Sequence, residues 1–215
     1  MRIIRVDSHE PDPALIEQAA DALLDGGIVA YPTDTVYGLG CDATNLDAVS
    51  RLGALKQRAA SEPFPIIIHT RATLRHLVAD LTPEIDVVLR RHWPGGLTVV
   101  FQRRGSALSA VSPQGTLGIR IPDSPIALAI ARALARPIVA TSANLSGCPP
   151  LGCASEIAEV FTGRIDLIVE ETSPRSDSDH TTPSTVLDLS GETPRILREG
   201  TIARADLARY LPTLE

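Results

Sequence analysis

The sequence predicts an α/β fold in which a twisted, open, mixed sheet is flanked by helices. Short aliphatic runs, such as residues 66–68 and 138–140, alternate along the chain with segments of helical periodicity. Hydrophobic residues make up 44% of the chain but aromatic residues only 3%, so the core is built from aliphatic side chains. A length of 215 residues suits one large domain, and we assign residues 1–215 to a single domain.

The first part of the chain predicts a strand, a helix, a strand and a helix in turn. A short strand over residues 1–6 precedes a helix that Asp12 caps, with a proline in its first turn and two glycines after its end. A strand over residues 28–31 follows, and the next helix begins at Asn45 or Asp47. The spacing of apolar residues in the first helix predicts one buried face, made of Leu15, Ala19, Ala22 and Leu23.

Aliphatic runs and capped periodic segments define the remaining elements in the same way. Ser124, followed by a proline, begins a helix that runs to Ala135. Further strands are expected at residues 66–68, 97–101, 118–121, 138–140, 167–169, 185–189 and 195–197. Further helices are expected near residues 74–78, 83–91, 204–210 and after residue 155. This alternation of strands and helices predicts the mixed sheet.

The negative charge of the chain argues against non-specific binding to nucleic acid. The formal net charge is −6, whereas non-specific binding to nucleic acid needs a surplus of basic residues to displace counterions. No apolar leader segment opens the chain, and no apolar run approaches membrane-spanning length. We therefore expect a cytoplasmic protein without a membrane partner.

Polar residues and glycines follow two of the predicted strands. In the segment 31–43, Thr35 offers a small hydroxyl, and Gly38 and Gly40 allow a ligand to approach the backbone closely. The segment 142–147 supplies further hydroxyl and amide groups after another strand. Loops that leave strand ends in open α/β sheets commonly bind ligands. From spacing alone, a turn that satisfies its own backbone explains either segment.

Four cations stand out from the sequence. Lys56 is the only lysine, and Lys56 with Arg58 ends a predicted helix, where the pair can bracket a polyphosphate or offset the helix dipole. Arg120 lies within an aliphatic strand, where its charge requires either an anionic ligand or a structural ion pair. Arg198 follows Ser184 closely and offers another group that can bind an anion.

Two further features concern a histidine and a loop. His69 follows the strand 66–68 and is the one histidine placed like a site residue, although an isolated histidine there is more often structural. Residues 172–184 lack apolar side chains, which predicts either a spacer or a lid over a ligand. No histidines or cysteines have the spacing of metal ligands, so we predict no metal site built from protein side chains.

Taken together, these segments resemble the YrdC-like threonylcarbamoyl-AMP synthase family in its single-domain form. Longer relatives carry an additional carboxyl-terminal domain, which we do not expect in this chain. The matching segments occur in the order of the family, which makes the resemblance specific: YPTDTVYGLGCDA (31–43), KQR (56–58), WPGGLT (93–98), GIRIP (118–122), TSANLSG (141–147), PSTVLDL (183–189) and ILREG (196–200).

The resemblance implies a deep basic cavity and the activity of a nucleotidyltransferase. Such an enzyme forms threonylcarbamoyl-AMP and pyrophosphate from L-threonine, bicarbonate and ATP, and Mg²⁺ is expected to accompany the ATP. The product serves the threonylcarbamoyladenosine modification of tRNA. A separate threonylcarbamoyl-transferase performs the transfer, so direct binding of tRNA by this chain is compatible with the reaction but not required.

The resemblance also implies a role for individual residues. Lys56 and Arg58 are the implied catalytic residues. The implied contacts of L-threonine are Thr35, His69, Arg120, Ser142 and Ser184. The implied contacts of ATP are Lys56, Arg58, Thr116, Asn144 and Arg198.

Two positions depart from the pattern of the family. Glu62 stands where relatives often carry asparagine or lysine, and Gly152 stands where many carry serine or threonine. Both changes remove expected contacts to the nucleotide. Two alternatives therefore stay open: a module that binds RNA through the same cavity, and a paralogue that handles another carbamoyl-adenylate.

Overall fold

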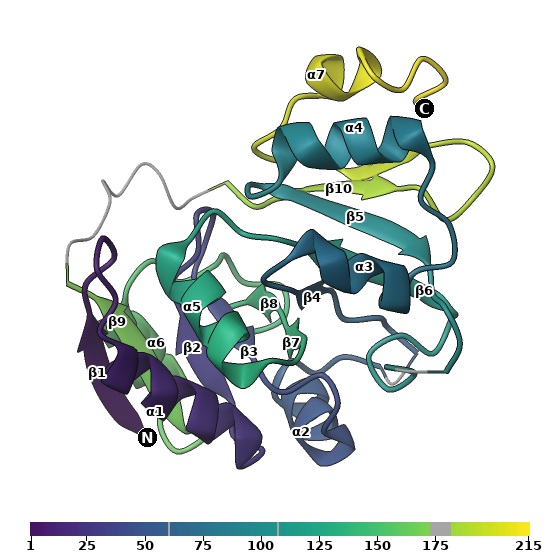
Figure 1. Ribbon diagram of the computed structural model, residues 1–215. Helices are drawn as coiled ribbons and strands as arrows, with labels where there is room; N and C mark the ends of the chain where they lie inside the picture. Colours follow the sequence, from purple (N-terminus) through teal and green to yellow (C-terminus); the bar gives the residue numbers. More distant parts are fainter. Residues whose placement is uncertain (60, 107, 173–181) are drawn as a thin grey trace.

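The computed structural model describes residues 1–59, 61–106, 108–172 and 182–215, and strands and helices alternate along it (Figure 1). The strands are β1 (Arg2–Val6), β2 (Val29–Tyr31), β3 (Gly38–Gly40), β4 (Ile66–Ile67), β5 (Leu97–Gln102), β6 (Thr116–Arg120), β7 (Ile138–Val139), β8 (Thr141–Ser142), β9 (Leu167–Glu171), β10 (Thr185–Asp188) and β11 (Arg195–Arg198). The helices are α1 (Pro13–Leu24), α2 (Leu46–Leu55), α3 (Leu74–Leu77), α4 (Pro83–His92), α5 (Pro125–Leu134), α6 (Ala154–Val160) and α7 (Arg204–Ala208), and the short 3-10 helix η1 (Arg71–Thr73) precedes α3.

The α/β class is confirmed, and the described strands divide between two mixed sheets. One sheet has the order β1-β9-β2-β3-β8, and the other has the order β11-β10-β5-β6-β4-β7. Each contains parallel and antiparallel pairs: β1 runs parallel to β9 and β2 antiparallel to β3, while β5 runs parallel to β10 and antiparallel to β6. The chain passes from one sheet to the other at Ala140, between β7 and β8. The two sheets are therefore joined at this point.

Strands β3 and β8 lie inside segments that the sequence predicted as loops. Tyr31 of β2 pairs with Gly38, and Gly38 in turn pairs with Ser142 of β8, both in antiparallel register. Neither strand contains a run of β-branched or aromatic residues, because β3 is Gly-Leu-Gly and β8 has only two residues. The local sequence therefore does not predict a strand at either place. Formation of β3 and β8 depends instead on pairing between segments that are distant in sequence.

The helices begin close to where the sequence predicts. The side chains of Asp12, Asn45 and Ser124 cap α1, α2 and α5, each by accepting a hydrogen bond from a backbone N–H in the first turn. The buried face of α1 differs from the prediction in part: its buried residues are Ile16, Ala19, Ala20 and Leu23, while Leu15 and Ala22 are only partly buried. Because the helix is rich in alanine, the spacing of its apolar residues fits a buried face centred on either Leu15 or Ile16. In the structure the helix is rotated so that the Ile16 side chain is buried.

Two hydrophobic clusters hold these layers together. In one, α1 and α5 pack side by side, and their residues Leu23 and Ile130 share a cluster with Leu167 of β9 and with Ile67 of β4 (Figure 1). The other cluster contains residues from both sheets, including Leu39 and Ile119. Both clusters therefore hold the two sheets together. Within the part of the chain that the structure describes, no helix combines the length and apolar character needed to cross a membrane.

Candidate active site

A cavity of about 410 Å³ lies where the two sheets meet, and its lining favours an anionic ligand. Residues of β2, β3 and β8 line it from one sheet, and residues of β4, β5, β6, β10 and β11 line it from the other. Among the described lining residues there is no carboxylate, but there are three arginines: Arg58, Arg120 and Arg198. Threonine and serine residues add hydroxyl groups to the lining: Thr33, Thr35, Thr98, Thr116, Thr141, Ser142 and Ser184.

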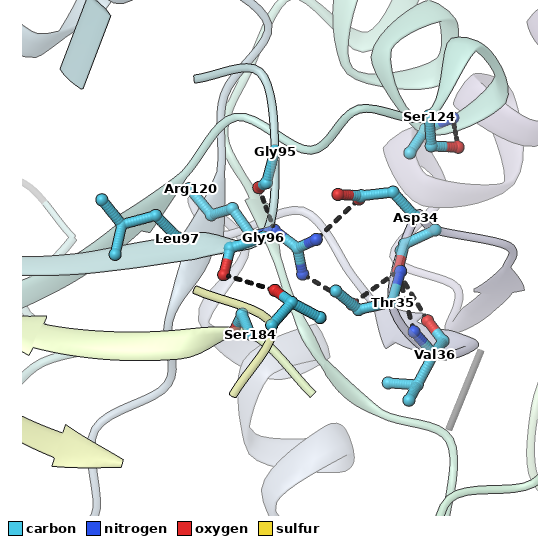
Figure 2. A network of polar contacts seen from close by, with 12 residues as sticks. Asp34, Thr35, Val36, Gly95, Gly96, Leu97, Arg120, Ser124 and Ser184 are labelled. Carbon is cyan, nitrogen blue, oxygen red and sulfur yellow. Dashed lines mark hydrogen bonds and ion pairs between the residues drawn. The ribbon is translucent and has the colours of Figure 1, made fainter. Parts of the chain in front are cut away.

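Arg120, the last residue of β6, joins three segments at one end of the cavity (Figure 2). Its Nη2 donates to Asp34 Oδ1 at 2.6 Å, its Nη1 to Thr35 Oγ1 at 2.8 Å, and its Nε to the Gly95 carbonyl at 2.9 Å. Arg120 is only 8% exposed, so its pair with Asp34 is a buried ion pair. A guanidinium has five N–H groups, and these described partners take three of them. The other two suit a planar carboxylate in the cavity.

Arg198 and Ser184 form an adjoining wall. Arg198 Nη2 donates to the Ser184 carbonyl at 2.8 Å and to Ser184 Oγ at 3.1 Å, and Ser184 Oγ lies 2.9 Å from Thr98 Oγ1. Burial lowers the pKa of Arg198, and the positive charges of Arg120 and Arg58 lower it further. The three guanidinium groups therefore act on one another electrostatically, and an anion between them would relieve their repulsion.

Lys56 follows the last residue of α2 and lies against the cavity wall rather than in its lining. Its Nζ donates to the Ser142 carbonyl at 2.8 Å and to the carbonyl and Oδ1 of Asn144, both at 2.6 Å. Ser142 Oγ also donates to Asn144 Oδ1. Burial, and to a smaller degree the charge of Arg58, lowers the pKa of Lys56 to about 8. Because an ammonium has three N–H donors, the protein itself accepts all of them.

Arg58 has a different environment although it is two residues away. Gln57 between the two cations has a φ of 52°, which turns the chain after the helix. Arg58 Nη1 donates to the Pro63 carbonyl at 2.8 Å, and its guanidinium lies 4.8 Å from the centre of the Phe64 ring. Glu62 Oε2 is 3.9 Å from Arg58 Nε and the Glu62 side chain is 57% exposed, so this pair is weak. Arg58 thus reaches the cavity with most of its donors uncommitted among the described residues.

The structure brings most of the predicted site residues to this one cavity. Those that line it are Thr35, Arg58, Thr116, Arg120, Ser142, Ser184 and Arg198. Lys56 and Asn144 support its wall through Ser142, whereas His69 is not among its lining residues. Most of the predicted lid, residues 173–181, lies outside the described residues. Gly152 is exposed and lies outside the lining, with its N–H donating to Glu156 Oε2 at 2.9 Å.

Sequence reasoning assigned no role to two residues that help to form the site. Asp34 is the ion-pair partner of Arg120, and the requirement that a buried arginine have a partner was the available signal. Tyr31 lines the cavity with its ring buried; the sequence placed it at the start of the segment 31–43 but assigned it no contact with a substrate.

The sequence of this chain is similar to those of one protein family. The model of the Sua5/YciO/YrdC family, described as "Telomere recombination", matches residues 21–200. A threonylcarbamoyl-AMP synthase of Bacillus subtilis is 37% identical over 89% of this chain and 55% of the relative, and one of Vibrio parahaemolyticus is 34% identical over 86% of this chain and 98% of the relative.

Solved structures of related proteins share the fold of this chain. The crystal structure of Pyrococcus abyssi Sua5 complexed with L-threonine superimposes with a TM-score of 0.90 at 32% identity, over 99% of this chain and 62% of that one. Escherichia coli YciO superimposes with a TM-score of 0.83 at 26% identity, over 98% of both chains. The chain thus spans only a little over half the length of some curated relatives, such as those of Bacillus subtilis and Pyrococcus abyssi. The family match and the shared fold together establish that this chain belongs to the Sua5/YciO/YrdC family.

Proposed function

We propose that this protein is an L-threonylcarbamoyladenylate synthase, which forms threonylcarbamoyl-AMP and pyrophosphate from L-threonine, bicarbonate and ATP. One observation carries the proposal: a single cavity combines a buried, ion-paired guanidinium at one end with two further arginines beside it, and its described lining contains no carboxylate. An amino acid and a polyphosphate both present anionic oxygens, so such a cavity suits the two substrates together. Relatives named threonylcarbamoyl-AMP synthase support the same reaction.

L-Threonine is assigned to the end of the cavity around Arg120. The two N–H groups of Arg120 left by its described partners would bind the carboxylate of the amino acid. Thr35, Ser142 and Ser184 would offer hydroxyls to its other polar groups. The related Sua5 of Pyrococcus abyssi has been crystallised with L-threonine, which supports this substrate. His69 remains a predicted contact without support from the cavity lining.

ATP is assigned to the side of Arg58 and Arg198, with Thr116 as a further lining residue. Asn144 and Lys56 would reach the phosphates only by exchanging some of their present hydrogen bonds, because Lys56 has three protein acceptors. Mg²⁺ would enter with ATP and be held mainly by phosphate oxygens, since the described lining residues contribute hydroxyls rather than carboxylates. We therefore expect Arg58 and Arg198 to make the first contacts with the nucleotide.

The chemistry requires positioning and neutralisation of charge, not a protein nucleophile. The amine of threonine combines with bicarbonate to form a carbamate and water. A carbamate oxygen then attacks the α-phosphorus of ATP, and the bond to pyrophosphate breaks. Cations placed around the phosphates stabilise the negative charge that develops on the leaving group. A separate transferase would then carry the threonylcarbamoyl group to tRNA.

The release of pyrophosphate from ATP tests this proposal. We expect release that requires both L-threonine and bicarbonate and that falls strongly when L-serine replaces threonine. ATP turnover that is indifferent to threonine would rule out the proposal. Equal turnover with serine or another carbamate donor would identify the paralogue that handles a different carbamoyl-adenylate.

A further inference from the structure

Tyr31 has a buried polar atom that neither the fold nor the proposed contacts explain. It is the last residue of β2, it lines the cavity, and it is 1% exposed. Its hydroxyl is fully buried and has no hydrogen-bond partner among the described residues. Buried hydroxyls nearly always have a partner, because an unpaired one loses its hydrogen bonds to water without replacement. An unpaired phenol in a cavity wall therefore needs an explanation.

The surrounding sheet is built to accommodate the Tyr31 ring. A Cβ atom at Gly38 would lie 3.2 Å from the Cε2 and Cζ atoms of Tyr31, and one at Gly40 would lie 2.8 Å from Cε1 and 2.5 Å from the Val139 carbonyl. No larger residue fits at Gly40 without movement of backbone. The sequence predicted that these glycines let a ligand approach the backbone, and Gly38 does line the cavity; both glycines also leave room for the tyrosine ring. The two glycines thus hold the phenol in one place against β3.

A Cβ atom at Gly38 would lie 3.5 Å from the Tyr31 hydroxyl, so the hydroxyl lies beside a residue that lines the cavity. Gly38 lines the cavity and pairs with Ser142, which lines it too. Burial raises the pKa of Tyr31, with a smaller rise from Cys41, while the nearby positive charge of Arg120 lowers it. The net shift is upward, so the phenol keeps its proton at neutral pH and can donate a hydrogen bond. An acceptor near this donor and near a guanidinium is most favourable when it carries negative charge.

We propose that the Tyr31 hydroxyl donates a hydrogen bond to a carboxylate-type oxyanion of the small substrate, bound at the end of the cavity formed by Gly38, Ser142 and Arg120. This inference rests on the proposed function. Two substrates carry this chemistry, the carboxylate of L-threonine and bicarbonate, and the geometry assigns the hydroxyl to this class of group rather than to the nucleotide. Tyr31 would thus be a binding residue for the reaction.

The substitution Tyr31→Phe tests the proposal because it removes the hydroxyl and keeps the ring in its slot. Without ligand, we expect the variant to melt at the same temperature as the wild type or higher, since no hydrogen bond to a described residue is lost. With saturating L-threonine or bicarbonate, we expect a smaller ligand-induced rise in melting temperature than in the wild type. The KM for one of these two substrates should rise about ten- to hundredfold, as for loss of a hydrogen bond to a charged group, while the KM for ATP stays constant.

Ser112→Ala is the matched control. Ser112 Oγ is likewise buried without a partner among the described residues, but Ser112 does not line the cavity. This variant should keep all three KM values. If it changed them as Tyr31→Phe does, the effect would come from removal of any buried hydroxyl, and the proposal would be wrong.

The remaining outcomes separate this inference from the proposed function. A rise in the KM for bicarbonate alone assigns the hydroxyl to bicarbonate, and a rise for threonine alone assigns it to the amino acid. If only the KM for ATP or only kcat changes, or if nothing changes, Tyr31 is not a ligand of the small substrate. A wild-type protein that releases pyrophosphate without threonine contradicts the proposed function itself, whatever Tyr31→Phe does.

Discussion

The two ends of the cavity differ in how much of their hydrogen bonding the protein supplies. At one end, Arg120 is buried and donates to Asp34, Thr35 and the Gly95 carbonyl. At the other, the described partners of Arg58 are one carbonyl acceptor at 2.8 Å and a distant, exposed carboxylate. A guanidinium fixed by three protein groups can select the orientation of a small substrate, whereas a loosely held one can adapt to a flexible polyphosphate. This comparison predicts effects of different size at the two ends.

The largest effect is expected from Asp34→Ala. This change leaves the Arg120 charge buried without its counter-ion, and breaking such a pair typically costs about 3–5 kcal/mol of the free energy of unfolding. The free guanidinium would also lose its orientation, so we expect the KM for L-threonine to rise at least about a hundredfold, equivalent to roughly 2.7 kcal/mol. Urea unfolding and the threonine dependence of pyrophosphate release measure the two effects.

Arg5→Ala is the control for this ion pair. Arg5 lies 2.7 Å from Glu170, nearly the same distance as in the Asp34–Arg120 pair, but its side chain is 77% exposed. We expect no measurable change in stability or in KM, because exposed pairs are screened by water. If Arg5→Ala lost as much stability and threonine affinity as Asp34→Ala, burial of the Asp34–Arg120 pair would not explain its importance.

The next effect concerns Lys56→Arg, which conserves the charge. Lys56 is 4% exposed, and its ammonium is surrounded by three acceptors, so a planar guanidinium cannot take its place without moving Ser142 or Asn144. We expect a loss of about 2 kcal/mol in the free energy of unfolding and a large loss of pyrophosphate release. If Lys56→Arg kept near-normal stability and a near-normal rate of pyrophosphate release, Lys56 would have no role beyond ending the helix.

Lys56 also predicts two opposite responses to pH. Its pKa is about 8 in the folded chain against an ordinary value of 10.5, so between these values the unfolded chain binds the additional proton. The free energy of unfolding of the wild type should therefore rise with pH across this window relative to Lys56→Met. Pyrophosphate release should fall above about pH 8, because the neutral amine has lost a donor and its charge. If the free energy of unfolding and the rate of pyrophosphate release changed in the same direction above about pH 8, this account of Lys56 would be contradicted.

The smallest effect is expected from Glu62→Gln near Arg58. Removing a weakly paired, exposed carboxylate should lower the KM for ATP about two- to fivefold, because one negative charge near the phosphates is gone. Glu159→Gln makes the same change of charge on an exposed residue of α6 and should leave the KM unchanged. If both variants changed the KM equally, net charge rather than the position of Glu62 would be responsible.

Sequence patterns predicted the parts of the fold that depend on local interactions. Asp12 and Ser124 cap helices as expected, because an N-cap acts within one turn. The Gly-Leu-Gly strand and the division into two sheets were not predictable, because they depend on pairing between segments distant in sequence. The need for a partner of Arg120 was predictable, but its identity as Asp34 was not, since 86 residues separate the two.

The most direct test of the account follows the carbon of bicarbonate. The protein is incubated with ATP, L-threonine and carbon-13 bicarbonate, and the nucleotide products are analysed by mass spectrometry. We expect threonylcarbamoyl-AMP that carries the labelled carbon, together with pyrophosphate, and neither product when threonine is left out. Pyrophosphate and unmodified AMP without any labelled adduct would contradict the proposed function.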